Sequence, residues 1–327
     1  MNPTANSTDR PSTPRWLHWW AVLTVLLTLA LLTLGAEVTT KQVGMVDKTP
    51  VRSPVHFFQE LSEHSSVGNL IQERGLGWVI EHLHRTVGWL VGICAIVLAV
   101  GLGLSEKRRW LRWAGLAALL GVTAQGVLGM LRVDQNSTMM ALIHGCSAQL
   151  VFALLVSVAL WTSPAWQQSL SANCEPVRRA SLALVAVTYV QIVLGAVLRH
   201  KELALGTRAH IILAFVVVGV AVWLGVRLMQ TQGVGGKRAA CLLWGLLAVQ
   251  LMLGLETMLS KFSVIGGYPA ERIEPLALAP DLIRSIHLVV GAMVFSTAVS
   301  IALVAHRHLA FAVKPLTTPQ RQLEGAL

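Results

Sequence analysis

Apolar residues dominate long stretches of the chain, and short polar segments separate them. Eight stretches are long enough to cross a bilayer as a helix, which takes roughly 20 residues. They cover residues 17–36, 79–104, 110–131, 139–162, 178–198, 209–230, 238–260 and 284–305. None shows the period-two alternation of a barrel strand, so the pattern predicts eight transmembrane helices.

A repeated motif divides these spans into units. Every odd-numbered span carries a five-residue motif that ends in Leu-Gly, and the next span carries a histidine near its start. The four pairs are LLTLG (31–35) with His84, QGVLG (125–129) with His144, QIVLG (191–195) with His210, and QLMLG (250–254) with His287. In the second and third pairs the histidine follows the glycine by 15 residues, and in the other two a longer loop intervenes.

The fourfold unit predicts an all-α integral membrane protein made of two tandem four-helix bundles. Each half has an even number of spans, so both halves insert the same way round. We therefore expect a pseudo-two-fold axis along the membrane normal to relate them. The predicted parts are an N-terminal tail (1–15), an N-terminal half (16–162), a linker (163–177), a C-terminal half (178–305) and a C-terminal tail (306–327).

Composition and charge fit a membrane protein. The chain is 54% hydrophobic and 13% charged, whereas soluble domains are about 25% charged. The net charge of +10 is attributed to membrane topology rather than to nucleic-acid binding. The four cysteines form no CxxC motif, so neither a disulfide framework nor a structural zinc site is expected.

Lysines and arginines predict the orientation. The side with both termini carries 14 of them and the other side 12. Five of the twelve lie beside helix ends near histidines and are set aside as having a local role; they are Arg85, Arg132, Arg199, Arg208 and Arg284. The remaining count of 14 to 7 predicts a multi-pass protein of a bacterial cytoplasmic membrane with both termini in the cytoplasm.

The repeated histidines are the main chemical signal. Every even-numbered span starts on the external side, so His84, His144, His210 and His287 are expected at matched depth, about one turn inside the membrane near the external face. Two facing helices of a bundle can each offer one imidazole to a haem iron. The sequence therefore predicts two bis-histidine haem sites, His84 with His144 and His210 with His287. A four-histidine zinc site would leave the metal charge uncompensated and is disfavoured.

Other residues near the histidines suggest supporting roles. Arg85, Arg208 and Arg284 are expected to contact haem propionates, since guanidinium binds carboxylate in a bidentate way; snorkelling to lipid headgroups is the alternative. The repeated glutamines are expected to hydrogen-bond between helices. Helix packing is the favoured role of the small residues Gly88, Gly145, Ala209 and Gly291. Solvated or interfacial positions are expected for the other histidines, which are His18, His56, His64, His82, His200, His306 and His308.

Glu81 makes the two predicted sites unequal. It precedes His84 by three residues and so shares its helix face. The other three histidines have Ala141, Thr207 and Arg284 at that offset. The site with a carboxylate suits a site of chemical reaction, and the site with arginines suits an electron-transfer site. We expect Glu81 to accept a proton or to position water; the alternative is that it pairs with Arg85 or orients His84.

This combination resembles the haem A synthase family. The segments that carry the resemblance are LGAEVTT (34–40), EHLHR (81–85), ALIHG (141–145), TRAHIILA (207–214) and RSIHLVVGA (284–292). The resemblance covers about residues 16–305. It implies oxidation of haem O to haem A for terminal oxidase assembly, in which two successive hydroxylations turn one ring methyl into a formyl group. It further implies a b-type haem on His210 and His287, substrate haem on His84 and His144, and a catalytic Glu81.

The resemblance has one departure and leaves alternatives open. Many family members carry a cysteine pair in the first external loop, but residues 37–78 contain no cysteine. The expected partners are haem O, haem O synthase, an electron acceptor, the lipid bilayer and a second copy of the chain. One alternative is a quinol-linked dihaem electron carrier, which needs the histidines but not Glu81. A transporter without redox chemistry is disfavoured because the spans look unbroken.

Overall fold

The computed structural model describes residues 13–44, 53–167, 175–201, 204–231, 234–265 and 280–307. Eight long helices run through this part of the chain: α1 (Arg15–Thr40), α4 (Leu76–Ser105), α5 (Arg109–Gln135), α6 (Thr138–Thr162), α7 (Glu175–Lys201), α8 (Ala204–Met229), α9 (Val234–Ile265) and α10 (Pro280–His306). All eight are long and apolar enough to cross a membrane. The prediction of an all-α protein with eight spans is therefore confirmed, and the chain is a multi-pass membrane protein.

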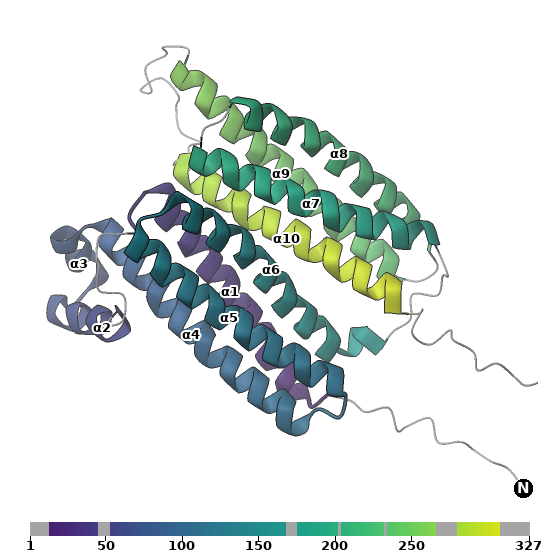
Figure 1. Ribbon diagram of the computed structural model, residues 1–327, viewed down its shortest axis with the longest axis horizontal. Helices are drawn as coiled ribbons and strands as arrows, with labels where there is room; N and C mark the ends of the chain where they lie inside the picture. Colours follow the sequence, from purple (N-terminus) through teal and green to yellow (C-terminus); the bar gives the residue numbers. More distant parts are fainter. Residues whose placement is uncertain are drawn as a thin grey trace, which may run out of the picture.

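The first four long helices form one bundle and the last four form another (Figure 1). In the first bundle α1 packs on α4, α4 on α5 and α5 on α6, and α6 closes the ring against α1. In the second bundle α7, α8, α9 and α10 follow one another in the same way, and α10 closes the ring against α7. Each bundle thus has two diagonals. The histidine-bearing helices α4 and α6, or α8 and α10, occupy one diagonal, and the helices with the Leu-Gly motif occupy the other.

The two bundles meet through three helix pairs. Helix α10 packs on α1 and on α6, and α6 also packs on α7. A two-fold axis would exchange the α1–α10 contact with the α7–α6 contact and would keep α6 against α10. The observed contacts have this form, and the axis itself stays a prediction.

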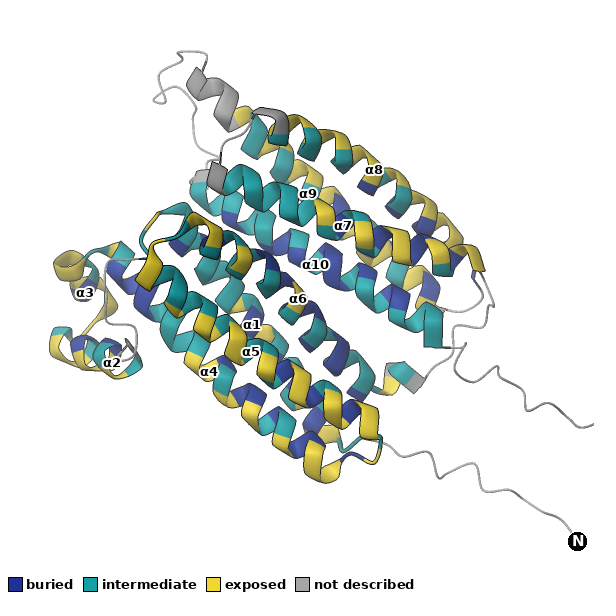
Figure 2. Ribbon diagram, in the orientation of Figure 1, coloured by how far each residue is buried: buried dark blue, intermediate teal, exposed yellow. Residues whose placement is uncertain are grey.

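The tightest packing lies away from the histidines. The buried core of the first bundle joins the start of α1 and α5 to the end of α4 and α6; its members are Leu17, Ala21, Leu98, Leu102, Leu111, Ala118, Leu155 and Val158. The second bundle has the corresponding core, which runs from Val177 on α7 to Ile301 on α10. Figure 2 shows the exposed residues on the outward faces of the helices, and many of them are large and apolar, such as Leu104 and Phe215. The outward faces therefore suit lipid.

The end at which α4, α6, α8 and α10 begin is called the histidine end below. A tight connection between α5 and α6 lies there. Asn136 ends α5 in the left-handed conformation with φ of 43°, and the Ser137 side chain accepts a hydrogen bond from the Met140 amide to cap α6. This short turn fixes α5 and α6 as antiparallel neighbours.

Two helices that the sequence did not predict lie beside α4 at the histidine end (Figure 1). They are α2 (Ser53–His64) and α3 (Val67–Arg74), and both pack on α4 and on each other. A small apolar cluster of Phe57, Leu70, Trp78 and Val79 holds them there. The short 3-10 helix η2 (Pro164–Gln167) follows α6. Most of the predicted tails, and residues 168–174 of the predicted linker, lie outside the described residues.

Candidate functional site

The four repeated histidines lie at matched depth. Each is the seventh to ninth residue of its helix, which places it roughly 9–12 Å from the helix start at ~1.5 Å per residue. Matched positions along the helices were expected, and the depth of one turn inside the membrane stays a prediction. The helices begin several residues before the apolar spans, because polar residues such as Asp281 also join them.

Each histidine packs against the glycine that ends the motif of its own unit. A Cβ atom added at Gly35 would come within 2.9 Å of His84 Cε1, one at Gly195 within 3.1 Å of His210 Cε1, and one at Gly254 within 3.0 Å of His287 Cε1. The fourth pair is looser, with 3.6 Å between such an atom at Gly129 and His144 Cε1. We call these four glycines the glycine seats. They explain why the motif ends in glycine: a side chain there would occupy the space of the imidazole.

A backbone carbonyl faces each ring from the first position of the same motif. The carbonyl groups of Leu31, Gln125, Gln191 and Gln250 lie within hydrogen-bonding range of His84, His144, His210 and His287. Leu31 can replace glutamine in the first unit because the backbone, not the side chain, makes this contact.

One ring nitrogen, Nδ1, makes no hydrogen bond in any of the four histidines within the described chain. Nδ1 of His84, His144, His210 and His287 is buried, and it has no hydrogen bond within the part of the chain that the structure describes. Buried polar atoms are normally satisfied. Four orphaned nitrogens at one depth therefore indicate atoms that are reserved for a ligand.

The histidines of each half face one another across the bundle. His84 and His144 are close enough to interact electrostatically, as are His210 and His287. Within the described ranges no group of three or more His, Cys, Asp or Glu side chains could hold a bare metal ion. Two imidazoles per half fit a haem iron, since the porphyrin supplies the remaining ligands. The orphaned nitrogens and the Cβ-free seats thus agree with one haem in each half.

The repeated glutamines bind across to the histidine helices, as expected. Gln125 Nε2 donates to Ser147 Oγ at 2.8 Å, and Gln191 Nε2 donates to the His210 carbonyl at 2.9 Å. Gln250 Nε2 lies 3.3 Å from Nε2 of His287. The glutamines therefore link the two diagonals of each bundle at the level of the imidazoles.

The small residues beside the histidines divide into two groups. A Cβ at Gly88 would meet Leu31 at 3.8 Å, and one at Gly291 would meet Gln250 at 3.2 Å. These two glycines serve helix packing, which was the favoured interpretation. At Gly145 the added atom would meet nothing within 4 Å.

Glu81 and Arg85 form a buried ion pair one turn apart on α4. Arg85 Nη2 donates to Glu81 Oε1 at 2.6 Å, and the side chains are only 12% and 2% exposed. The alternative that Glu81 pairs with Arg85 is therefore what the structure shows. The pairing fixes the carboxylate beside the first histidine pair, and a catalytic role of Glu81 stays a prediction.

The other arginines lie differently from the prediction. Arg208 is exposed, and Arg284 reaches Asp281 at 3.7 Å. Arg132, which was not assigned to a haem site, acts electrostatically on both His84 and His144. The sequence suggested a carboxylate at one site and arginines at the other. Arg132 and Arg85 both lie near the first histidine pair, so arginines are found beside the carboxylate site as well. Arg132 lies three residues after the glycine seat Gly129, and this position is the sequence signal that could have placed it near the histidines.

Three further histidines lie at or near α2 and α3. The expectation that His82 is solvated is wrong: it is fully buried, and its ring stacks on Trp78 with 3.7 Å between centroids. His56 Nε2 lies 3.2 Å from Glu60 Oε1, and His64 Nε2 lies 2.7 Å from Glu73 Oε2. These side chains hold α2 and α3 against α4.

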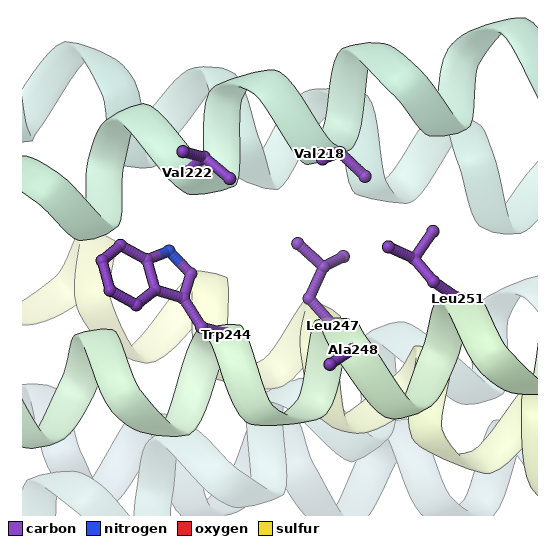
Figure 3. A pocket seen from close by; sticks show the side chains of 6 residues that line it. All are labelled: Val218, Val222, Trp244, Leu247, Ala248 and Leu251. Atoms are coloured by element: carbon purple, nitrogen blue, oxygen red, sulfur yellow. The ribbon is translucent and has the colours of Figure 1, made fainter.

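An apolar groove lies between α8 and α9 (Figure 3). Its volume is about 370 Å³, and Val218, Val222, Trp244, Leu247, Ala248 and Leu251 line it. No titratable side chain lines the groove, so it can take hydrocarbon but offers no acid–base or ligand chemistry.

Comparison with known proteins supports the family predicted from the sequence. The family model of COX15-CtaA, described as cytochrome oxidase assembly protein, matches residues 58–209. The matched segment contains Glu81, His84 and His144 and ends one residue before His210. Neither a curated protein nor a solved structure gives a match. Residues 58–209 of the chain thus match the COX15-CtaA family of cytochrome oxidase assembly proteins, the haem A synthase family that the sequence resembles.

Proposed function

We propose that the protein is a haem A synthase, an oxidoreductase that converts a ring methyl of haem O to a formyl group. Two hydroxylations of the same carbon, each of which takes its oxygen from water and releases two electrons to an external acceptor and two protons, give a geminal diol, which loses water to become the aldehyde. The observation that carries the proposal is the buried Glu81–Arg85 pair beside the facing histidines His84 and His144. All four residues lie within the segment that matches the family.

The two halves are assigned different haems. The first half would bind haem O through His84 and His144, because a buried carboxylate adjoins only this pair in the described chain. The second half would hold haem b through His210 and His287. Haem b bound there would supply one-electron redox chemistry.

Glu81 is the proposed proton acceptor. Oxidation of the methyl carbon breaks C–H bonds, and a carboxylate near that carbon can take up a released proton. Arg85 Nη2 donates to Glu81 Oε1 at 2.6 Å and so holds the carboxylate in a fixed position. His84 follows Glu81 by three residues on the same helix, so ligand and acceptor are positioned by one rigid element.

The setting follows from the same proposal. The chain would lie in a bacterial cytoplasmic membrane, with its termini in the cytoplasm and the histidine end near the external face. Haem O synthase would deliver the substrate, and an electron acceptor outside the chain would complete the reaction.

The test uses the full-length protein from cells that also make haem O. Extracted pigments are identified by pyridine haemochrome spectra and mass. We expect haem B with haem O or haem A from the wild type, no haem A from His84→Ala or Glu81→Gln, and retention of haem B in both variants. Arg238→Gln, a change at an exposed position near the start of α9 and away from the histidines, is the control and should keep haem A. Two haem B per chain, with Glu81→Gln indistinguishable from wild type, would instead identify a dihaem electron carrier.

A further inference from the structure

The last turn of α1 joins the two halves at the histidine end. Arg199 of α7 donates from Nη2 to the Ala36 carbonyl at 2.6 Å and also to the Thr40 hydroxyl. Arg132 of α5 donates from Nη1 to Thr39 Oγ1 at 3.2 Å. Two guanidinium groups, one from each half, therefore converge on one helix end.

These two arginines lack a carboxylate partner. The nearby acids Glu37 and Asp281 are both within 4 Å of Lys41, at 3.7 Å and 3.4 Å. Within the ranges that the structure describes, no ion pair involves Arg132 or Arg199; their acceptors are a carbonyl and hydroxyls. The α1 dipole and the longer-range attraction of Glu37 and Asp281 for Arg199 offset only part of the two positive charges, which also repel each other. Half-buried cations of this kind favour an anionic partner.

The pair of arginines lies beside the first histidine site. Arg132 acts electrostatically on His84 and on His144. Ala36, which Arg199 holds, follows Gly35, the glycine seat of His84. Arg199 itself is one turn beyond Gly195, the seat of His210. A group that binds both guanidiniums would thus lie next to the first site and at the boundary with the second.

The other arginines near the histidines are poorer candidates to bind the same group. Arg85 is already engaged by the Glu81 carboxylate. Arg208 is exposed. Among the described arginines near the first histidine pair, Arg132 and Arg199 are therefore the two whose positive charge is not neutralised by an ion pair.

We propose that Arg132 and Arg199 form a carboxylate-binding site, which holds a propionate of the haem that His84 and His144 bind. This inference rests on the proposed function for the identity of the haem. It replaces Arg85 and Arg208 as propionate contacts. Because Arg199 belongs to the second half, the substrate's own carboxylate would be bound by both halves at once.

The experiment compares a haem that has free propionates with one that has none. Haem B and its dimethyl ester are titrated into the protein in nanodiscs of phosphatidylcholine. The spectrum of the His84→Ala variant, titrated in the same way, is subtracted from each spectrum, so that only binding to the first site is counted. We expect the wild type to bind the free acid at least about tenfold more tightly than the ester, the effect of a charge-assisted hydrogen bond. Arg132→Gln and Arg199→Gln should lose most of this preference.

Two further variants control the result. Arg208→Gln removes the same charge from an exposed site and should keep the wild-type preference. Arg132→Lys keeps the charge but loses the planar fork, so it should retain part of the preference, and it replaces Arg132→Gln if that variant does not fold.

The outcomes separate this inference from the proposed function. Equal affinity of the wild type for acid and ester would overturn the inference while leaving the haem site in place. An unchanged preference in both Gln variants would do the same. Absence of any His84-dependent haem spectrum would overturn both. A last outcome concerns lipid: phosphatidylglycerol added to the nanodiscs could stabilise the wild type but not Arg132→Gln, while the wild type shows no preference for the free acid over the ester. In that case the site binds a lipid phosphate and the inference is wrong.

Discussion

The His84 imidazole lies so close to Gly35 that a Cβ atom added at Gly35 would come within 2.9 Å of its Cε1 atom. The corresponding distance from Gly129 to His144 is 3.6 Å, an ordinary van der Waals contact. The same architectural element is therefore tight in one unit and relaxed in another. This difference gives the chain its own matched control.

Gly35→Ala is expected to displace the His84 ring and to weaken haem binding to the first half. Overpacking costs about 1–3 kcal/mol, so haem affinity should fall by about tenfold or more. Gly129→Ala should change affinity by less than about twofold. The measurement is a haem titration of both variants by difference spectroscopy. Equal losses in the two would show that the seats do not position the imidazoles.

Arg85→Gln is expected to destabilise the protein by about 3 kcal/mol, because it removes the guanidinium that is bonded to the buried Glu81 carboxylate. Glu81→Gln should cost less, since the longer Arg85 side chain can turn its charge toward water. The double variant should recover most of the stability of the wild type. Thermal unfolding in detergent measures all three, and additive losses in the double variant would contradict the ion pair.

Glu106, in the turn between α4 and α5, predicts a pH dependence of stability. Burial raises the pKa of this carboxyl, but hydrogen bonds from Arg108 and Thr13 outweigh it and hold the pKa at about 2, below the ordinary 4.5. A lowered pKa stabilises the fold above pH 4.5, and the contribution is lost as the pH falls toward 2. Glu106→Gln should therefore be less stable at pH 7 by about 2 kcal/mol, and the difference from wild type should shrink on acidification. Parallel unfolding curves at all pH values would refute this.

His64 predicts the opposite dependence at α2 and α3. Hydrogen bonds to the Glu60 carbonyl and to the Glu73 carboxylate raise the pKa of this imidazole. The stabilisation is complete below pH 6.5, the ordinary pKa, and is lost as the pH rises through the raised value. Limited proteolysis within residues 53–74 should be faster at pH 8.5 than at pH 6 in the wild type. His64→Gln should be cleaved at similar rates at both pH values once protease activity is normalised.

Periodicity and length were enough to predict the eight spans, because a helix in lipid must be long, apolar and unbroken. The repeat also predicted which histidines pair, since equal units place equal residues at equal depth. The resemblance to the family that matches residues 58–209 was carried by the same residues. The short helices α2 and α3 escaped prediction because they are short and mostly polar overall, and their apolar faces rest on α4.

The arginines show where reasoning from sequence spacing stops. Arg85 adjoins His84 in the chain, but its partner is Glu81, four residues away on the same helix. Arg132 follows Gly129 by three residues and is 12 residues from His144, yet it acts on His144 because the turn at Asn136 folds α6 back along α5. Contacts of this kind depend on the packing of neighbouring helices, which the sequence pattern does not specify.

The alternation of glycine and histidine helices around each bundle restricts how such a protein can grow. One hairpin of a glycine helix and a histidine helix supplies a single axial ligand, and two hairpins place their ligands on the same diagonal. If one hairpin were added to either bundle, a fifth and a sixth helix would lie outside the ring, and one imidazole would have no second imidazole to pair with. Enlargement that preserves paired ligands must therefore add four helices at a time, and the two bundles of this chain correspond to one such doubling.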